Sequence, residues 1–427
     1  MSSGLKKLLS LVLAASMVAL LSVNMLAAQG GLGNFTFSGE YAAGQFSDVS
    51  GSEWFAQYVE GAYNYGFLQG KSADTFDPGG LLTLGEAVTL AARLMSIYKI
   101  GAADFPESSP FYQVYADYAL QNGIVGSHGN YASITSRARF AQLVYNALPP
   151  EAFTGINTVP DYAICDVTPD DSYGAAVYAL YRAGVLVGSD DYGTFFPGSS
   201  LTRAEACAIL VRLADPAARV RASLPASIPA EVLYQRCTDA VFLIETFDVG
   251  NVSIRTGSGF FISDTGLAVT NLHVIENAAK ATITLPNGEE YPVRGVHAFS
   301  DENNLVLFSV DSDDGGWSYL SLADSDMIET GNTVYAIGSP LSFINTMTEG
   351  IVSNKEREVD GQTMIQFTAP ISFGSGGSAV INTLGQVIGV ASSSFSYGQN
   401  LNLAVPSNCI KELRPGECIS LRDFLYH

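Results

Sequence analysis

The C-terminal half of this chain contains the residue types that acyl transfer needs. His273 lies in the stretch TNLHV, and Ser375 lies in the glycine-rich stretch FGSGG. In this chemistry a serine hydroxyl attacks a carbonyl, a histidine takes its proton, and a carboxylate holds the histidine in the correct tautomer. Backbone N–H groups of a glycine-rich turn can form an oxyanion hole, for which Gly374 and Gly376 are candidates. These residues outline a hydrolytic site that still requires a carboxylate.

The elements that would position these residues are short strands. From Val241 onward, runs rich in β-branched and aromatic residues, such as VFLIETFDV, GSGFFIS and NLVLFSV, are separated by Gly, Asn and Asp. Asn287-Gly288 between two such runs predicts a hairpin turn. Many short strands at this spacing predict an all-β domain of paired antiparallel barrels.

Several stretches of this segment occur in the order found in trypsin-like serine peptidases of the HtrA/DegP kind. They are residues 256–260, 267–275, 334–340, 349–353, 368–372, 385–390 and 402–407. Over residues 232–427 the chain therefore resembles that family, which implies a trypsin-like double barrel whose cleft binds peptides or unfolded protein segments. The resemblance also implies that His273 is the general base. The PDZ domain that often follows in the family is expected to be absent, because the chain stops at His427.

The position of the catalytic acid departs from the family pattern. In the family the acid begins a strand written DLAVL, and the matching run here is NLVLF, which places Asn304 at that position. Changing this carboxylate to an amide costs about 10⁴ in kcat, because the amide favours the wrong histidine tautomer. Asp301 could substitute only if its loop rearranged, and a solvated loop carboxylate is the simpler interpretation.

The nucleophile position is ambiguous. The pattern GSGG offers Ser375, but an ungapped match to the family, anchored on 369–372 and 379–382, places Gly376 at the catalytic serine position. We prefer the ungapped register, in which the hydroxyl of Ser375 is offset beyond hydrogen-bond reach of His273. An oxyanion hole without a nucleophile would bind only a carbonyl or a carboxylate.

The middle of the chain contains three repeats of about 50 residues, at 44–97, 103–148 and 162–214. Each has a helix-periodic stretch, a glycine turn, a polar loop and a second apolar helix, a plan typical of repeat modules. In the third repeat, Thr202 followed by Glu205 predicts a capping box.

The repeats resemble S-layer homology (SLH) modules, most fully in the LTRAE stretch of residues 201–205. The first repeat has LTLGE instead and loses the arginine, and the second has SRAR and loses the glutamate. The resemblance implies all-α modules around a pseudo-threefold axis that bind an anionic secondary cell-wall polysaccharide. A guanidinium pairs with a carboxylate in two parallel hydrogen bonds. The candidate polymer-binding residues are Arg203, Arg137, Glu205 and Trp54; helix capping is the alternative role of Glu205.

The N-terminus predicts export. Lys6 and Lys7 precede an apolar run and the small residues Ala27 and Ala28, which is the order of a secretory signal peptide over residues 1–28. The run is short for a membrane anchor. Residues 215–231 contain three prolines and predict a linker before the last domain. The expected location is the cell wall or S-layer surface.

The amino-acid composition argues against nucleic acid, membranes and metal ions as partners. The chain has 42 acidic and 21 basic residues and a formal charge of −21, which argues against nucleic acid and anionic membranes. No cysteine or histidine spacing indicates zinc, and the acidic turn at Asp311, Asp313 and Asp314 lacks the ligand spacing of a calcium loop. We therefore expect neither metal nor cofactor. Five scattered cysteines predict free thiols with at most one bridge, between Cys409 and Cys418.

The combined interpretation is a multidomain, exported protein with all-α SLH repeats and an all-β double barrel. The preferred function is a wall-anchored pseudoprotease that binds peptides. The first alternative is an active surface endopeptidase using Ser375 and His273. The second is a structural component of an S-layer.

Overall fold

The computed structural model describes residues 30–311, 316–339, 345–392 and 401–425. The expected signal peptide, and Asp313 and Asp314 of the acidic turn, lie outside these ranges. The chain forms two compact units: one comprises residues up to 159 with 170–189 and 195–223, and the other comprises 160–169, 190–194 and 224–427. No helix in the described ranges is long and apolar enough to cross a membrane.

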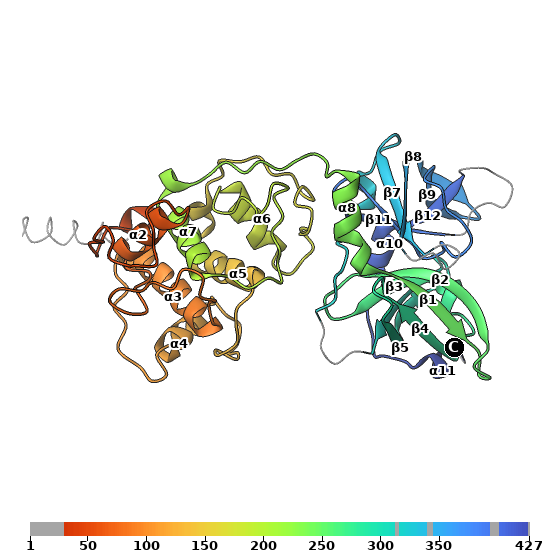
Figure 1. Ribbon diagram of the computed structural model, residues 1–427, viewed down its shortest axis with the longest axis horizontal. Coiled ribbons are helices and arrows are strands. Elements are labelled where there is room, and N and C mark those ends of the chain that lie inside the picture. Colours follow the sequence, from red (N-terminus) through yellow and green to blue (C-terminus); the bar gives the residue numbers. More distant parts are fainter. Residues whose placement is uncertain (1–29, 312–315, 340–344, 393–400, 426–427) are drawn as a thin grey trace, which may run out of the picture. The chain divides into compact units, whose positions relative to one another are not determined.

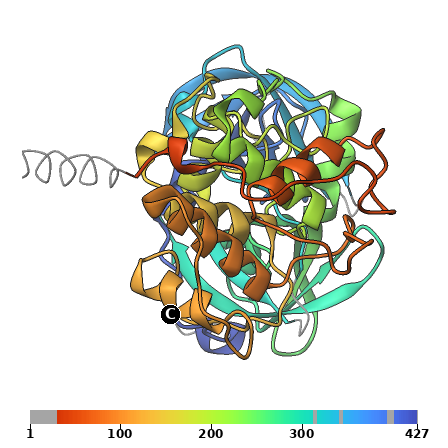
Figure 2. The same ribbon diagram turned by 90° about the vertical axis from the view of Figure 1, so that its left-hand side faces the viewer.

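The first unit is built from helix pairs, one for each sequence repeat (Figure 1, Figure 2). The helices are α2 (Ala56–Asn64), α3 (Leu84–Ile100), α4 (Gln113–Gln121), α5 (Arg137–Ala147), α6 (Gly174–Arg182) and α7 (Arg203–Ala214), with short 3₁₀ turns at Leu32–Asn34, Pro150–Phe153 and Pro216–Ala218. The expected capping box at Thr202 and Glu205 is present on α7, and Thr83 with Glu86 forms another on α3. On α5, Ser136 caps alone, because Arg139 stands where a glutamate would be.

The second helices of the three repeats are linked in a ring. The first residue of each donates its backbone N–H to the loop of another repeat: Arg203 to Gly80 (2.9 Å), Arg137 to Ser199 (2.8 Å) and Leu84 to Ser133 (2.8 Å). Isolated β-bridges join the same segments, at Leu81–Thr202, Thr83–Ile134 and Ser136–Ser200. Each helix N-terminus therefore finds acceptors in a neighbouring repeat, and groups from different repeats come together around the ring.

The second unit contains two closed six-stranded barrels, as the strand spacing predicts. The first has the order β1-β2-β3-β6-β5-β4: β1 (Val241–Phe247), β2 (Ser253–Phe261), β3 (Leu267–Asn271), β4 (Lys280–Thr284), β5 (Glu290–Ser300) and β6 (Leu305–Val310). The second has the order β10-β11-β12-β9-β8-β7: β7 (Thr333–Gly338), β8 (Thr346–Val359), β9 (Gln362–Phe367), β10 (Ala379–Ile381), β11 (Val387–Ala391) and β12 (Asn402–Pro406). Short helices α8 (Ala230–Cys237), α9 (Leu272–Ile275), α10 (Ser407–Glu412) and α11 (Leu421–Phe424) complete the unit, with 3₁₀ turns at Thr238–Ala240 and Ser325–Met327.

The two barrels share one buried cluster. Phe260 and Leu305 of the first barrel belong to the same hydrophobic core as Ile337 and Val390 of the second. Each barrel also has its own core, with Phe242, Phe261 and Phe308 in the first. Because this shared apolar cluster is removed from water, it holds the two barrels against each other, and the loops at their junction keep a defined spacing.

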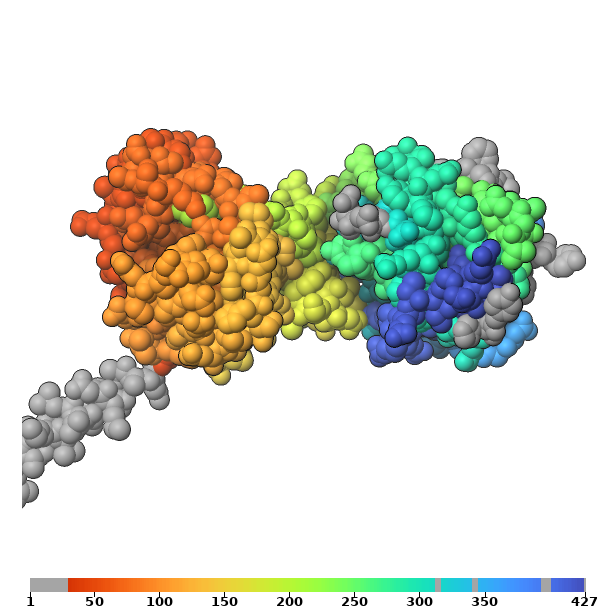
Figure 3. Space-filling view, turned by 90° about the horizontal axis from the view of Figure 1, so that it is seen from below, coloured from red at the N-terminus to blue at the C-terminus, as the bar shows by residue number. Residues whose placement is uncertain are grey.

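The C-terminal segment returns to the first barrel. The backbone of Ile419 exchanges two 2.8 Å hydrogen bonds with Val296 of β5, and the blue C-terminal residues lie against the first barrel in Figure 3. All five cysteines are free thiols. The bridge considered between Cys409 and Cys418 is absent: Cys409 lies on α10, whereas Cys418 lies near Ser309 of β6.

Candidate functional site

The pairing of two strands brings the histidine and the asparagine together. His273 lies in α9 directly after β3, and Asn304 precedes β6. These strands are antiparallel partners with Asn271 opposite Leu305. The carbonyl of Asn304 accepts a hydrogen bond from the Leu272 N–H (3.0 Å), and its φ of 48° turns the chain into β6. Asparagine tolerates this left-handed conformation better than most residues do.

The Asn304 amide contacts His273 twice. Its Oδ1 accepts the backbone N–H of His273 (2.9 Å), and its Nδ2 lies 2.8 Å from the imidazole Nδ1. Oδ1 is farther from Nδ1, at 3.2 Å. The backbone contact orients the amide with Oδ1 toward the His273 N–H, which leaves Nδ2 as the amide atom nearer to Nδ1. We infer from this shorter distance that Nδ2 donates to Nδ1 and that the imidazole proton is on Nε2. A general base needs the opposite tautomer, with a free lone pair on Nε2.

Burial lowers the pKa of His273 from its ordinary value of 6.5. The charge of Arg255 also lowers this pKa, whereas the charge of Glu276 raises it, and the net direction is down. The imidazole is therefore neutral at neutral pH and presents an N–H group from Nε2.

We expect imidazole ¹⁵N–¹H spectra of the protein to place the His273 proton on Nε2, with a pKa below 6.5. Asn304→Asp should move the proton to Nδ1 and raise the pKa, because a carboxylate accepts from Nδ1–H and stabilises the imidazolium. His297, whose Nε2 lies 2.9 Å from the Ser309 hydroxyl, is an internal control that should not change. A proton on Nδ1 in the unmodified protein would contradict this assignment.

Gly376 is the residue of the glycine-rich loop that faces the histidine. A Cβ added to Gly376 would lie 3.2 Å from Nε2 of His273 and 3.4 Å from Oδ1 of Asn271. The position from which a serine would reach the imidazole therefore carries no side chain.

The structure does not bring Ser375 or Asp301 to the histidine. Ser375 is buried, at 3% exposure, and its hydroxyl accepts the backbone N–H of Ser372 at 3.1 Å. Asp301 is exposed, and its backbone carbonyl accepts the N–H of Asn304 at 3.3 Å. Of the sequence candidates, His273, Asn304 and Gly376 thus converge, whereas the Ser375 hydroxyl bonds Ser372 and the exposed Asp301 makes no hydrogen bond to the imidazole within the described residues.

Hydrogen bonds across the barrel junction fix the loop. The N–H of Ser258 on β2 donates to the Gly376 carbonyl (2.8 Å), and its hydroxyl donates to the Gly374 carbonyl (2.9 Å). The same hydroxyl accepts the N–H of Ser339 at 2.8 Å. Ser258 is fully buried, so this network holds the loop of the second barrel against the first. Ser258 was not a candidate from the sequence, although it lies in the stretch 256–260 that resembles the HtrA/DegP family.

The glycine-rich loop has unused hydrogen-bond donors. Within the described ranges, the backbone N–H groups of Gly374 and Gly376 have no hydrogen-bond acceptor. Beside Gly376 lie Nε2 of His273 and Oδ1 of Asn271, a buried amide oxygen that has no partner in the described residues. Unpaired N–H groups of such a turn can bind a carbonyl oxygen, but Gly376 supplies no nucleophile to attack one.

A second candidate site lies in the helical unit. Trp54, Arg137, Glu205 and Arg212 line a cavity of about 390 Å³ with residues 186–189 of the third repeat. Arg137 bonds Glu205 (2.7 Å) and the Phe195 carbonyl (2.7 Å). Trp54 is 56% exposed. The three repeats each contribute to this cavity, so three of the four sequence candidates for polymer binding meet in one place.

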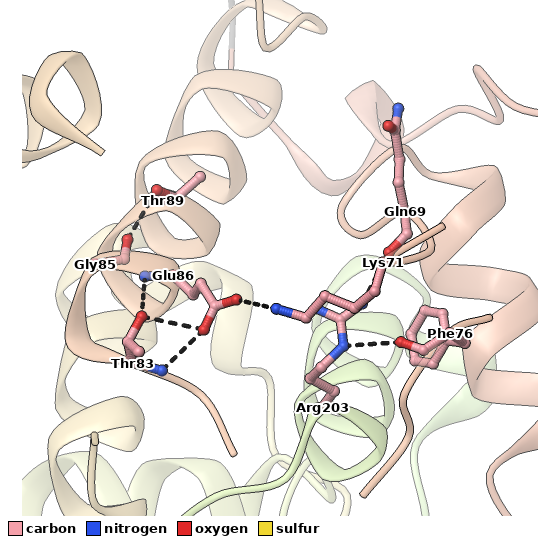
Figure 4. Close-up of polar contacts among 8 residues, drawn as sticks. All are labelled: Gln69, Lys71, Phe76, Thr83, Gly85, Glu86, Thr89 and Arg203. Carbon is pink, nitrogen blue, oxygen red and sulfur yellow. Dashed lines mark hydrogen bonds and ion pairs between the residues drawn. The ribbon is translucent and has the colours of Figure 1, made fainter. Parts of the chain in front are cut away.

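Arg203 is placed differently from Arg137. Its side chain is 5% exposed, donates to the carbonyls of Phe76 (3.0 Å) and Gln69 (2.8 Å), and lies 4.7 Å from the centre of the Phe76 ring (Figure 4). Nearby, Glu86 pairs with Lys71 at 2.7 Å. Arg203 therefore fixes the loop of the first repeat and, unlike Arg137, does not line the cavity.

Sequence reasoning missed Arg212 as a cavity residue. It donates to the Tyr58 hydroxyl (2.8 Å) and the Val185 carbonyl (3.1 Å). The repeat alignment carried a signal for it, since Arg93 occupies the same position after LTLGE that Arg212 occupies after LTRAE.

Comparisons with known families agree with this architecture. Residues 257–390 match the trypsin-like peptidase domain, and residues 45–88 and 166–207 match the S-layer homology domain. The second repeat is not among the matched segments.

Curated relatives of the second unit are serine proteases. The chain is 36% identical to a probable periplasmic serine endoprotease DegP-like of Rickettsia prowazekii, over 38% of this chain and 33% of the relative. It is 33% identical to serine protease HTRA1A of Danio rerio, over 38% of this chain and 34% of the relative. The chain thus spans about a third of the length of these relatives.

Among solved structures, the HtrA-type protease AlgWS227A with tripeptide is 28% identical, with a TM-score of 0.40 over 43% of this chain and 62% of that chain. On the family matches and the curated relatives, the chain contains two S-layer homology segments and a trypsin-like peptidase domain whose relatives are the HtrA and DegP serine proteases.

Proposed function

We propose that this protein is exported, is held on the cell wall by its SLH modules, and displays a trypsin-like domain that binds peptides without cutting them. One observation carries the proposal: the residue facing Nε2 of His273 is Gly376, which has no hydroxyl. The module limits 44–97, 103–148 and 162–214, the linker 215–231 and the last domain 232–427 belong to this proposal, as does a pseudo-threefold arrangement of the modules.

Three features of the cleft support a binding role. The amide of Asn304 leaves the imidazole with the tautomer that cannot take a proton from a nucleophile. The N–H groups that would stabilise an oxyanion have no other acceptor in the described residues. Phe373 beside the loop is 91% exposed, so its ring offers an apolar surface to a bound peptide side chain.

The cavity lined by Trp54, Arg137 and Glu205 supports anchoring to a wall polymer. An exposed indole ring can stack on a sugar face, and a guanidinium can pair with an acidic sugar. Arg137 is 8% exposed and uses two guanidinium nitrogens, for Glu205 and for the Phe195 carbonyl, so Nη2 is the nitrogen that remains for such a ligand among the described residues. The acidic overall charge makes this local basic group the expected contact for an anionic polysaccharide.

Labelling with a fluorophosphonate serine probe tests the peptidase-like domain. We expect the folded full chain to show no labelling, because the hydroxyl of Ser375 is buried and hydrogen-bonded to Ser372. An active HtrA-type protease labelled in parallel shows that the probe is competent. Labelling that disappears in Ser375→Ala would establish Ser375 as a nucleophile and would support the alternative of an active endopeptidase.

A further inference from the structure

We propose that the space beside Gly376 is a binding site for one neutral hydroxyl oxygen. This oxygen accepts a hydrogen bond from Nε2–H of His273 and donates one to Oδ1 of Asn271. Two sources can supply it: a water molecule, or the side chain of a serine or threonine in a bound peptide. Only the second source rests on the proposed peptide-binding function.

The acceptor of this site is a buried amide oxygen. Asn271 ends β3 and is fully buried, and its Oδ1 has no hydrogen-bond partner in the described residues. Its Nδ2 donates to the carbonyl of Asn304 at 3.2 Å. This contact fixes the orientation of the amide, because a flipped amide would place Oδ1 against that carbonyl. A buried acceptor without a donor is unfavourable, so Oδ1 points to a ligand that carries one.

The donor of the site is the imidazole ring. The 2.8 Å contact between Nδ2 of Asn304 and Nδ1 of His273 leaves the imidazole proton on Nε2. His273 is half-buried, and its lowered pKa keeps the ring neutral at neutral pH. The site therefore has one neutral donor and one neutral acceptor.

Both atoms lie beside the same point. A Cβ built on Gly376 would be 3.2 Å from Nε2 of His273 and 3.4 Å from Oδ1 of Asn271, and the next atom, Cε1 of His273, would be 3.5 Å away. A side chain at residue 376 would fill this place, whereas glycine leaves it to a ligand. Gly376 and His273 are both only partly buried, so the place is not sealed from solvent.

The pairing of one donor with one acceptor selects a hydroxyl group. A carboxylate oxygen would accept from Nε2–H but would face Oδ1 as a second acceptor, and an ammonium group would face Nε2–H as a second donor. An alkyl group would leave both atoms unpaired. A hydroxyl oxygen both accepts and donates, so a single atom satisfies His273 and Asn271.

Crystal structures of the full chain test the site itself. At a resolution that shows ordered water, the unmodified chain without peptide should show an oxygen within hydrogen-bond distance, about 2.6–3.2 Å, of both Nε2 of His273 and Oδ1 of Asn271. Gly376→Ala should not show it, because the added methyl group occupies its place. Gly376 is not among the described residues with positive φ, so alanine keeps the backbone conformation.

Peptide binding to the full chain distinguishes the two sources. Nine-residue peptide pools carry a central serine, O-methylserine or alanine, with flanking positions randomised over residues without hydroxyl groups, and binding is measured by fluorescence anisotropy. If a peptide supplies the hydroxyl group, the serine pool should bind about tenfold more tightly than the other two pools, which lack the hydroxyl proton. Gly376→Ala should remove this difference and still bind the alanine pool. If water supplies the oxygen, all three pools should bind equally.

A second variant tests the donor–acceptor arrangement. Asn304→Asp at pH 8.5 places the imidazole proton on Nδ1, so that Nε2 and Oδ1 both accept. Water has two protons and should remain, whereas a peptide hydroxyl group has one, and the tenfold preference for serine should be lost. Asn303→Asp adds the same charge at the adjacent residue, whose side chain makes no hydrogen bond to the imidazole in the described residues, and should behave like the unmodified chain. Thermal melting confirms that each variant is folded.

The outcomes separate the site from the proposed function. A preference for serine identifies a peptide as the source of the hydroxyl group, and a bridging oxygen without that preference identifies water. The absence of both would overturn the site, and a serine preference that persists in folded Asn304→Asp would overturn the donor–acceptor arrangement behind it. Failure of the folded chain to bind any pool would overturn the proposed peptide-binding function, and the crystal structures would then decide the site on their own.

Discussion

A chain carrying both Gly376→Ser and Asn304→Asp is expected to react with a fluorophosphonate probe and to hydrolyse an unfolded fluorescent protein substrate. The new Cβ would lie 3.2 Å from Nε2 of His273, which places a hydroxyl within reach of the imidazole after a shift of a few tenths of an ångström. Gly376 is not among the residues with positive φ, so serine can adopt its conformation.

The two single substitutions should distinguish the missing hydroxyl at residue 376 from the unproductive tautomer of His273 as causes of inactivity. Asn304→Asp alone should give no labelling, since the loop still has no hydroxyl in front of the imidazole. Gly376→Ser alone should label slowly, because the amide keeps the unproductive tautomer. Adding Asn304→Asp to Gly376→Ser should raise the labelling rate by up to about 10⁴-fold. This is the factor by which the triad carboxylate raises kcat in serine proteases.

The control for the double variant is Gly376→Ala with Asn304→Asp, which has the same backbone and the same carboxylate but no hydroxyl. It should remain unreactive. If the double serine variant is folded and still fails to label, then Gly376 does not stand at the nucleophile position or the N–H groups of Gly374 and Gly376 do not form an oxyanion hole. The proposed origin of the inactivity would then be wrong.

Substitution of Trp54 or Arg137 is expected to release the protein from purified cell-wall preparations. Trp54→Ala removes an exposed ring that lines the cavity, so we expect about a tenfold weaker association with little change in stability. Arg137→Ala should weaken binding further, because it removes the guanidinium that would pair with an acidic sugar.

Arg137→Ala also removes the 2.7 Å partner of Glu205, which keeps its hydrogen bonds from Thr202, so we expect a loss of about 1–3 kcal/mol of stability. Binding must therefore be compared at a temperature where melting curves show the variant to be folded. Arg139→Ala is the matched control: Arg139 lies on the same helix, is exposed, and does not line the cavity. Equal association of the folded Arg137→Ala and Arg139→Ala proteins would contradict a role of this cavity in anchoring.

Much of the architecture could be predicted from local sequence patterns. Alternating runs separated by Gly, Asn and Asp predict short strands, and the structure closes twelve of them into two barrels. The spacing of Thr202 and Glu205 predicts a helix N-terminus, and α7 begins there with the expected reciprocal hydrogen bonds. These features depend on residues close together in the chain, which is why a single sequence reveals them.

The placement of the arginines in the repeats could not be predicted from local sequence. Arg203 lies in the complete LTRAE motif, yet it is buried against the loop of the first repeat. Arg137 lies in the poorer motif SRAR and lines the cavity with Trp54 and Arg212. The difference depends on which loop each helix meets in the ring, and that pairing joins residues more than 100 positions apart, as with Arg203 and Phe76.

The sequence by itself determined the inventory of the peptidase-like site: a histidine in TNLHV, an asparagine before a strand, and a glycine-rich turn with one serine. Only the tertiary structure decided that Gly376 faces the imidazole while the hydroxyl of Ser375 turns toward Ser372, and that the Asn304 amide donates to Nδ1. The physical reason is that neighbouring residues in a tight turn point in different directions. Hydrogen bonds from Ser258, on the other barrel, hold the carbonyls of Gly374 and Gly376 and so fix which residue of the turn faces His273.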